Sequence, residues 1–471
     1  MKRTKIVCTL GPASCERGPL LDMARAGMDV ARFNFSHGTH EWHAERFKIL
    51  RSLDDEVGRP LAALQDLSGP KLRIGELPPE GLELVPGRRV RLSTDEFEAG
   101  DEPRISVPIP ELVSMLAPGN SVYLDDGQIE LTVVAERADE VLCEVVHGGT
   151  LRSRKGVSAP AVPFQIASLT SKDYKDLDFG LALGMDWIAV SFVRRASDLE
   201  PVRAVARRRG VEAKIIAKIE KPEAVENLDE ILAASDGLMV ARGDLGVEMP
   251  LYQVPVIQKR LIRECVCRGK PVITATQMLE SMTQSPRPTR AEVSDVANAI
   301  FDGTSAVMLS GETAVGAHPA QTVATMASIA EYTEQHLDYS GLLTQGLRAS
   351  VEGITDAISQ GVAEIANDLK VAAILCSTTS GHTARMVSRT RPNMPIIAAT
   401  ANERTYRRLA LIWGVRPLLV KATTNTDEML AATVQGALSA GWIRSGDTVV
   451  ITSGVPVGTP GHTNLIKVQQ V

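Results

Sequence analysis

Short apolar runs rich in β-branched residues alternate with helix-length stretches over much of the chain. Eight runs stand out: Lys5–Leu10, Val30–Phe35, Leu61–Asp66, Trp187–Phe192, Lys214–Ile219, Gly237–Ala241, Pro271–Thr276 and Ala306–Leu309. Strands buried on both faces have this composition, and the helix-length stretches between them indicate parallel βαβ units. Eight such units predict an α/β fold, a (β/α)₈ TIM barrel.

Each of these runs leads into small, polar or charged residues. They are Thr9, Asn34, Ser36, Asp66, Ser191, Lys218, Glu220, Arg242, Asp244, Thr276, Ser310 and Glu312. A TIM barrel carries its active site at the C-terminal ends of its strands. Polar groups at all eight ends therefore predict one crowded polar site at the mouth of the barrel.

An insertion separates the third run from the fourth. Residues 70–168 are rich in Pro and Gly turns, with short alternating strands at Ser121–Leu124, Ile129–Val134 and Val141–Val146. This pattern predicts a small β-barrel domain inserted on the catalytic face, where it can act as a lid. The catalytic barrel would then be divided between residues 1–69 and 169–346.

The alternation restarts in the last quarter of the chain. Its strand candidates are Ala372–Cys376, Pro395–Ala399, Val415–Leu419 and Thr448–Thr452. They predict a separate, open α/β domain over residues 347–471. Three domains agree with a length of 471 residues at about 150 residues per domain.

Composition and charge narrow the class of protein. Hydrophobic residues make up 44% of the chain and charged residues 23%, as in an ordinary globular protein. The net charge of −6 gives no general positive field, so we expect no nucleic-acid partner. No apolar run approaches the roughly 18 residues of a membrane span. Six cysteines without a C-x-x-C pair indicate reduced, buried thiols and a cytoplasmic protein.

The sharpest local signal comes from two strand ends, Lys218-Ile219-Glu220 and Arg242-Gly243-Asp244. Lys218 and Glu220 are two residues apart, so both can point into the barrel mouth. Two carboxylates would hold Mg²⁺ or Mn²⁺, and the lysine would stabilise a transferring phosphoryl group. A structural ion pair at the barrel rim explains the same residues equally well.

Three polar residues alternate along the second run: Arg32, Asn34 and Ser36. Period 2 places them on one face, where they form either a site or a satisfied buried network. The nearby His40 and His43 lack the H-E-x-x-H spacing of a metal site and are interpreted as a solvated helix start. Only His37, beside the strand end, is a candidate site residue.

Two small-residue loops mark the C-terminal domain. The first contains Ser377, Thr378, Thr379, Ser380, Gly381 and Thr383, and the second spans Ser453–Thr463. Hydroxyls and backbone N–H groups at a helix N-terminus form an anion site. Either loop alone is better explained as a plain turn, but together they predict a phosphorylated ligand away from the barrel mouth.

Long motifs in this sequence resemble those of the pyruvate kinase family. They are KIVCTLGPAS (5–14), ARFNFSHGTHEWH (31–43), AKIEKPEAV (217–225), MVARGDLGVE (239–248), PVITATQMLESM (271–282), PRPTRAEVSDVANAIFDGTSAVMLSGETA (286–314) and SGVPVGTPGHTN (453–464). They stand in the family order and cover essentially the whole chain. The resemblance implies a glycolytic phosphotransferase that converts phosphoenolpyruvate and ADP into pyruvate and ATP.

The resemblance also implies roles for individual residues. Lys218 would stabilise the migrating phosphoryl group, Arg32 would contact it, and Glu220 and Asp244 would hold the divalent metal. The substrate carboxylate would meet Ala241, Arg242, Gly243, Asp244 and Thr276. The nucleotide would face Asn34, Ser36, His37, Arg73 and Lys155. Thr276 and the Ser310–Glu312 region would serve protonation of the enolate.

The family's monovalent cation site would lie at Asn34, Ser36, Asp66 and the carbonyl of Leu67. Many members continue with G-P-E-I-R, whereas this chain has Gly69-Pro70-Lys71-Leu72-Arg73. We hypothesise that the Lys71 ammonium replaces K⁺, pairing with Asp66, because lysine is a compact charge on a long stem. K⁺ would then not be required. The alternative is that Lys71 points to solvent.

The resemblance further implies a homotetramer with an allosteric site for a phosphorylated effector at Ser377–Thr383. A metal-dependent carbon–carbon lyase is one alternative, since carboxylates at neighbouring strand ends also suit enolate chemistry. A lyase needs no nucleotide lid, so the inserted domain counts against this alternative. The other alternative is a non-catalytic sugar-phosphate sensor. The presence of the predicted catalytic residues argues against a sensor: Lys218, Glu220, Asp244 and Thr276.

Overall fold

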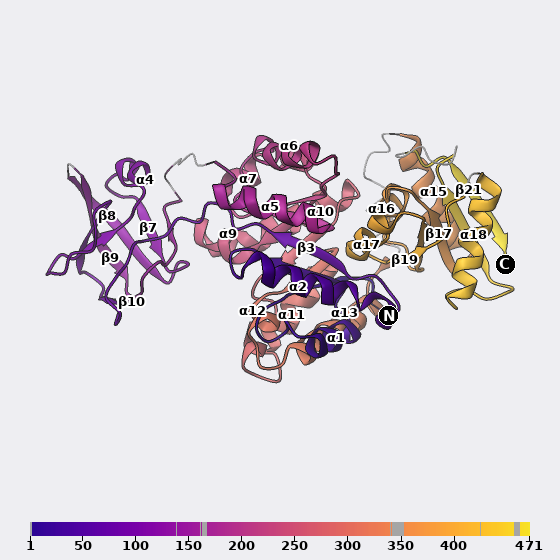
Figure 1. Cartoon of the computed structure of the whole chain (residues 1–471), viewed down its shortest axis with the longest axis horizontal. Helices are drawn as coiled ribbons and strands as arrows, with labels where there is room; N and C mark the ends of the chain where they lie inside the picture. Colours follow the sequence, from indigo (N-terminus) through magenta and orange to yellow (C-terminus); the bar gives the residue numbers. More distant parts are fainter. Residues whose placement is uncertain are drawn as a thin grey trace.

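A computed structural model describes residues 2–137, 139–160, 162, 167–339, 341, 353–423, 425–455 and 462–471. Three domains lie in a row, with the insertion at one end, the barrel in the middle and the C-terminal domain at the other end (Figure 1). The predicted domain boundary at 346/347 lies outside the described residues. In the ranges given above, no helix is both long enough and apolar enough to span a bilayer.

The central domain is a closed barrel of eight parallel strands in the order β1-β16-β15-β14-β13-β12-β3-β2. The strands are β1 (Lys5–Thr9), β2 (Val30–Asn34), β3 (Ala62–Asp66), β12 (Trp187–Val190), β13 (Ile215–Ile219), β14 (Gly237–Ala241), β15 (Val272–Ala275) and β16 (Ala306–Leu309). Each falls within one of the eight apolar runs, so the predicted barrel is confirmed.

Helices surround the barrel. They are α1 (Arg17–Ala26), α2 (His40–Arg51), α3 (Asp54–Val57), α5 (Ser171–Leu183), α6 (Glu200–Arg208), α7 (Pro222–Glu226), α8 (Leu228–Ala234), α9 (Arg242–Glu248), α10 (Val254–Cys267), α11 (Arg290–Phe301), α12 (Gly311–Ala314) and α13 (Pro319–Gln335). Their apolar faces and the outward side chains of the strands share one core of Ile, Leu, Val, Met and Phe. This packing fixes the strand ends that carry the polar residues.

The insertion between β3 and α5 is a small β domain. Its elements are β4 (Leu82–Leu84), β5 (Arg89–Ser93), β6 (Arg104–Ser106), α4 (Pro110–Met115), β7 (Ser121–Leu124), β8 (Ile129–Arg137), β9 (Glu140–His147), β10 (Gly149–Leu151) and β11 (Val157–Ser158). Six strands form one sheet in the order β11-β7-β8-β9-β5-β6, and β10 pairs with β4 in a second sheet. Both sheets enclose one apolar core, so the domain packs on its own.

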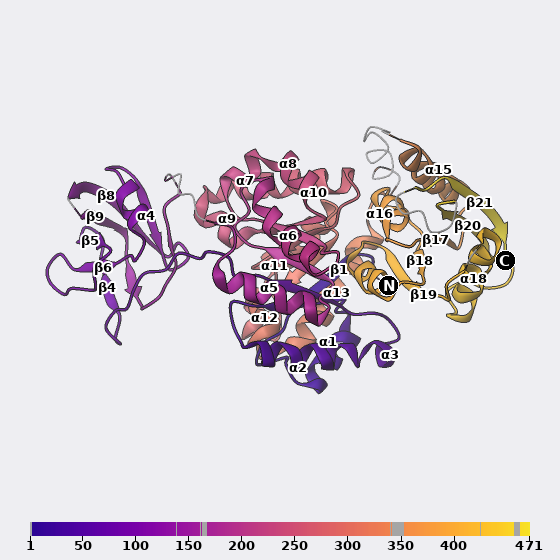
Figure 2. The same cartoon turned by 45° about the horizontal axis from the view of Figure 1, so that its top comes forward.

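The C-terminal domain is an open sheet with helices on both faces (Figure 2). Its elements are α15 (Ile354–Asp368), β17 (Ala373–Ser377), α16 (His382–Arg389), β18 (Ile396–Thr400), α17 (Glu403–Arg408), β19 (Val415–Leu419), α18 (Thr426–Ser439), β20 (Thr448–Ser453) and β21 (Leu465–Gln470). The four predicted strands are parallel, and β21 adds an antiparallel edge beside β20.

Helix α5 approaches strand β3 so closely that it requires a glycine. The buried side chain of Gln65 in β3 donates a hydrogen bond from Nε2 to the carbonyl of Asp176 in α5 (2.7 Å). A Cβ atom added to Gly180 would lie 2.0 Å from Oε1 of Gln65. Gly361 in α15 is the opposite case, because a Cβ there would meet its nearest neighbour at 3.5 Å.

We expect Gly180→Ala to destabilise the protein by about 1–3 kcal/mol, because the new methyl group must displace the buried Gln65 side chain. Gly361→Ala is the matched control and should stabilise by about 0.5–1 kcal/mol through helix propensity alone. Thermal unfolding of the two variants checks both values. A Gly180→Ala protein as stable as Gly361→Ala would contradict the close approach.

Candidate active site

A buried cluster of charges occupies the mouth of the barrel. Nζ of Lys218, from β13, lies 2.8 Å from Oε1 of Glu220, 3.3 Å from Oδ1 of Asp66 and 2.7 Å from the Ser191 hydroxyl. Arg32, from β2, contacts the other oxygen of Asp66 through Nε at 2.7 Å. Asp66 and Glu220 are each about 1% exposed. Strands β2, β3 and β13 therefore bring predicted site residues together at one point.

Electrostatics couples these groups. Burial alone would raise the pKa of Asp66, but Lys218 and Arg32 outweigh it and hold the pKa below its usual value. Burial would lower the pKa of Lys218, and the carboxylates of Asp66, Glu220 and Asp244 raise it above the usual range instead. For Glu220, burial raises the pKa, with help from Asp244 and against Lys218. The lysine therefore stays cationic.

Glu220 and Asp244 are the two carboxylates at the barrel mouth that could hold a divalent cation. Burial and the neighbouring Asp244 charge both disfavour an ionised Glu220, and a bound cation would remove that penalty. Glu220 is held in place because its Oε2 accepts from the backbone N–H of Phe192 (2.6 Å). Mg²⁺ commonly binds through one or two carboxylates plus substrate oxygens. Within the described ranges, no point gathers three or more His, Cys, Asp or Glu side chains suited to a metal.

Thr276 closes the next side of the cluster, directly after β15. Its backbone is in the left-handed region (φ +68°), and its hydroxyl accepts from the backbone N–H of Gly243 (2.8 Å). The guanidinium of Arg242 is committed to Asp295 at 2.6 and 2.8 Å, and to the Thr276 carbonyl at 2.6 Å. Arg242 therefore contributes to the site through its backbone, while its side chain fixes the loops.

The segment after β16 is also buried. Glu312 is fully buried and accepts hydrogen bonds from the backbone N–H groups of Leu279 (3.2 Å) and Ser310 (2.6 Å). In the part of the chain that the structure describes, the buried Ser310 hydroxyl makes no hydrogen bond. The expected role of this region in protonation stays a prediction.

The predicted alternation along the second strand is only partly right. Arg32 faces inward and donates to the Thr9 hydroxyl (2.9 Å) as well as to Asp66. Strand β2 ends at Asn34, whose side-chain oxygen accepts from the backbone N–H of Ser36 (3.2 Å). Ser36 is thus an exposed turn residue, because the chain leaves the strand before it.

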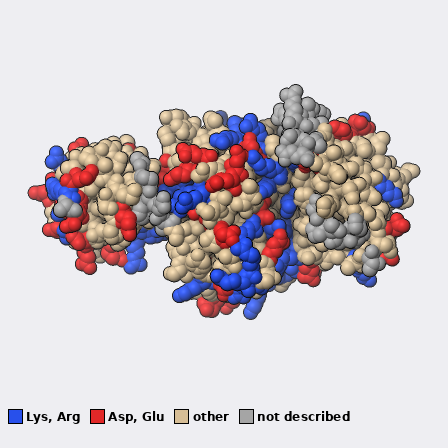
Figure 3. Space-filling model, turned by 90° about the horizontal axis from the view of Figure 1, so that it is seen from above, with Lys and Arg blue, Asp and Glu red and all other residues tan. Residues whose placement is uncertain are grey.

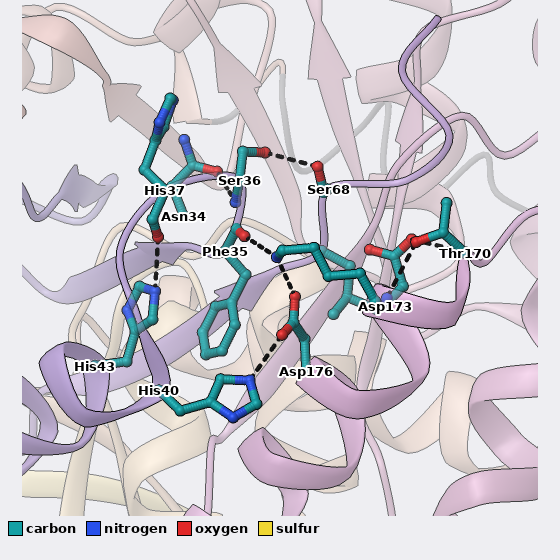
Figure 4. Close-up of polar contacts among 12 residues, drawn as sticks. Asn34, Phe35, Ser36, His37, His40, His43, Ser68, Thr170, Asp173 and Asp176 are labelled. Carbon is teal, nitrogen blue, oxygen red and sulfur yellow. Dashed lines mark hydrogen bonds and ion pairs between the residues drawn. The ribbon is translucent and has the colours of Figure 1, made fainter.

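The interpretation of His40 and His43 as a solvated helix start holds for His40, which begins α2 with its side chain 37% exposed, and is wrong for His43. His43 is 1% exposed, stacks on Phe35 with ring centres 4.0 Å apart, and bonds through Nε2 to the His37 carbonyl (3.0 Å). His40 stacks on Phe179 and contacts Asp176 at 2.7 Å. Figure 4 shows the His37 side chain pointing away from His43. These rings pack α2 against the barrel.

The expected pairing of Lys71 with Asp66 is also wrong. Nζ of Lys71 lies 2.9 Å from Oδ1 of Asp126 inside the insertion, and its side chain is 34% exposed. Asp66 is already neutralised by Arg32 and Lys218. Lys71 and Asp126 line a cleft between the insertion and the barrel, together with Asp244.

The remaining nucleotide candidates lie apart from the cluster. Lys155 pairs with Asp125 (2.7 Å), and Arg73 donates to the carbonyl of Arg154 (2.8 Å), both within the insertion. Lys172 was missed by the sequence analysis. Its Nζ donates to the carbonyl of Phe35 (2.6 Å), beside the loop that follows β2. Its position in the first turn of α5, directly after the insertion, is the sequence feature from which this contact could have been suspected.

The predicted anion loop follows β17 and opens α16. The Thr378 hydroxyl accepts from the N–H of Gly381 (3.0 Å), and the Thr383 hydroxyl lies 2.9 Å from that of Thr463. The second predicted loop therefore borders the first, although its residues 456–461 lie outside the described ranges. The ligand itself stays a prediction.

All six cysteines are free; Cys8, Cys15, Cys143, Cys265 and Cys376 are buried and Cys267 is half-buried. Burial raises the pKa of the Cys143 thiol to about 12. The prediction that most of the thiols are buried is confirmed.

Comparison with known proteins decides the family. The family model of the pyruvate kinase barrel domain matches residues 1–323, and that of the pyruvate kinase alpha/beta domain matches residues 356–469. The chain belongs to the pyruvate kinase family. A pyruvate kinase of Geobacillus stearothermophilus is 50% identical over 473 residues, which cover 100% of this chain and 80% of that protein.

Other pyruvate kinases agree along the whole chain. The one from Sporosarcina psychrophila is 47% identical and is covered to 81% of its length, with 100% of this chain aligned. The one from Clostridium acetobutylicum is 43% identical, with 100% of both chains aligned. The predicted family is confirmed, as is the arrangement of a barrel, an inserted domain and a C-terminal α/β domain.

We expect buried His43 to make the stability of this pyruvate kinase family member depend on pH. Burial lowers the pKa of His43 to about 4, against the weaker opposing effect of the His37 carbonyl. The unfolded chain binds this proton near the ordinary pKa of about 6.5, so His43 should cost stability progressively as the pH falls from 6.5 to 4. The full effect is about 3 kcal/mol.

Thermal unfolding at pH 7 and pH 5 checks this prediction. His43→Phe should lose less stability than the wild type over that interval, because the variant has no imidazole to protonate. His147→Phe changes a largely exposed histidine and is the control. Equal losses in all three proteins would contradict the prediction.

Proposed function

We propose that the protein transfers the phosphoryl group of phosphoenolpyruvate to ADP, giving pyruvate and ATP. The observation that carries the proposal is the buried cluster of Lys218, Arg32, Asp66 and Glu220 at the barrel mouth. Phosphoryl transfer depends on positioning and charge neutralisation more than on covalent catalysis. The absence of a membrane-spanning helix in the described residues is compatible with the cytoplasmic location that we propose.

Each residue has a chemical task in this reaction. Lys218 and Arg32 place two positive charges beside the transferring phosphoryl group as its bond to the enolate oxygen breaks and a bond to the terminal ADP oxygen forms. Thr276 and the backbone of Arg242–Asp244 bind the carboxylate of the substrate. The enolate that remains takes a proton at its methylene carbon on the Thr276 side, which completes pyruvate.

Glu220 and Asp244 would hold Mg²⁺ or Mn²⁺. When bound, the divalent cation supplies positive charge to the substrate oxygens and offsets the two carboxylates. The insertion would close over the nucleotide and exclude water, which otherwise competes as the phosphoryl acceptor. On the face drawn in Figure 3, basic and acidic side chains interleave over the barrel. Local clusters and not the net charge therefore set the potential that the anionic substrates meet.

Lys218→Met tests the central assignment. We expect turnover to fall at least 10²–10³-fold, because the transferring group loses its principal cation. Lys214→Met removes a lysine at the opposite end of the same strand, where it pairs with Asp236, and should keep most activity. ATP formation from phosphoenolpyruvate and ADP is the assay. Comparable turnover in the two folded variants would refute the role of Lys218.

We also propose that the enzyme needs no K⁺. The oxygens expected to bind a monovalent cation already have protein partners. Asp66 is paired with Arg32 and Lys218, and the Leu67 carbonyl accepts from the Ser191 hydroxyl (2.8 Å). Lys71 adds a further positive charge where the chain enters the insertion, five residues beyond Asp66.

Lys71→Glu checks this proposal. The wild type should run at full rate in buffer free of Na⁺ and K⁺, whereas the variant should gain a requirement for K⁺ because its charge balance is reversed. Lys71→Met is the control that removes the ion pair with Asp126 without adding a negative charge. A wild-type rate that depends many-fold on K⁺ would sink the proposal.

Regulation and assembly complete the proposed function. The hydroxyl-rich loop before α16, bordered by Thr463, supports a site for a phosphorylated effector. Three large apolar side chains are exposed where the chain enters α10: Leu251 (74%) and Tyr252 (79%) in the 3-10 turn before the helix, and Val256 (70%) in its first turn. Apolar side chains gathered on one surface favour a protein contact, and we propose that they bury one another in a homotetramer.

A further inference from the structure

A single buried carboxylate joins both connections between the barrel and the insertion. Asp173 lies in the first turn of α5 and is fully buried. Its Oδ1 accepts from the backbone N–H of Gly69, where the chain leaves the barrel (3.1 Å). Its Oδ2 accepts from the N–H (2.8 Å) and the hydroxyl (2.6 Å) of Thr170, where the chain returns. One side chain thus accepts from both sides of the hinge.

The Gly69 end of this link cannot shift easily. Its φ of +65° lies in the left-handed region, and an added Cβ would lie 2.8 Å from the Phe192 ring and 2.9 Å from Cβ of Ser191. Gly69 is therefore wedged against the end of β12, two residues before Lys71. A residue with a side chain would therefore not fit at this end of the link.

The next turn of α5 holds the loop that follows β2. Asp176 is 3% exposed and contacts Nε2 of His40 through Oδ1 at 2.7 Å and Nζ of Lys172 through Oδ2 at 2.5 Å. Lys172 in turn donates to the carbonyl of Phe35 (2.6 Å). Figure 4 shows Asp173 and Asp176 side by side on the helix, with Asn34 at the end of β2 and Ser36 and His37 on the loop that follows.

A direct contact joins the loop after β2 to the hinge. The hydroxyl of Ser36 donates to that of Ser68, the residue before Gly69 (3.1 Å). The loop after β2, the exit to the insertion and α5 therefore form a closed ring of hydrogen bonds. Every link in this ring is a direct contact between side chains or backbone groups.

We propose that Asp173 is a positioning residue for the nucleotide. It fixes both hinge connections of the insertion to α5, and through Asp176 the same helix sets the position of the loop after β2. Closure of the insertion and the placement of Ser36 and His37 are thereby coupled. The inference rests on the proposed function, because it takes ADP as the ligand that this loop and the insertion enclose.

Asp173→Asn is the test. The amide oxygen can still accept from Gly69, but its NH₂ group faces the Thr170 donors and breaks that half of the link. We expect KM for ADP to rise about tenfold and kcat to fall. A 1 Å misplacement of a reacting group can cost roughly 10²-fold in rate, and this substitution breaks only half of the link. KM for phosphoenolpyruvate, which binds on the barrel floor, should stay within about twofold.

The chain supplies a matched control at α11. Glu292 accepts from the N–H and hydroxyl of its own N-cap, Thr289, and from the N–H of a distant residue, Ser281 (2.7 Å). Glu292→Gln changes the same kind of helix-capping carboxylate at a place distant from the hinge. It should also lower thermal stability, but it should leave KM for ADP unchanged. Thr170→Ser, which keeps the hydroxyl, should behave as wild type, and Thr170→Val should move in the direction of Asp173→Asn.

Hydrogen exchange of the peptide around Gly69 gives a readout that does not depend on activity. Asp173→Asn should speed its exchange, and Glu292→Gln should not. Unchanged exchange, or a KM for ADP equal to that of Glu292→Gln, would overturn the coupling. If the wild type forms no ATP from phosphoenolpyruvate and ADP, the proposed function fails, whereas the exchange measurement still decides whether Asp173 holds the hinge.

Discussion

Two carboxylates and two cationic side chains lie buried together at the barrel mouth, and the surrounding structure holds them in contact. Burying charge is costly, and even a paired set gains little for stability over apolar side chains. In the proposed function, Asp66, Glu220, Lys218 and Arg32 lie together because phosphoryl transfer needs their charges. The apolar strands around them supply the stability that the cluster itself does not.

The sequence alone was sufficient to predict the barrel and the polar residues that converge at its mouth. A parallel strand buried on both faces is a nearly continuous apolar run, so its end is easily seen. Residues at such ends converge whatever the intervening helices do, which is why Lys218, Glu220 and Asp66 were placed correctly. The edge strand β21 was missed because Lys467, Gln469 and Gln470 break the apolar pattern there.

Contacts between segments that are distant in the sequence could not be predicted from local sequence patterns. His43 is buried because Phe35 covers its ring, and nothing in the helix start around it shows that. Lys71 turns toward Asp126, which lies in the turn between β7 and β8 of the insertion, so the predicted partner Asp66 was wrong. The role of α5 arises from contacts to Gly69 and His40, more than 100 residues earlier in the chain. Each of these depends on packing between elements that no local pattern encodes.

The interrupted barrel also constrains how the chain folds. Strands β3 and β12 are neighbours, yet Trp187 pairs with Leu64 across the entire insertion. Joining such remote segments in an unfolded chain carries a loop-closure entropy that slows folding. If the insertion folds first around its own core, its two ends come together and that loop shortens to residues 67–69 and 169–186, which include α5. Weakening the core of the insertion would then delay closure of a barrel whose own sequence is untouched.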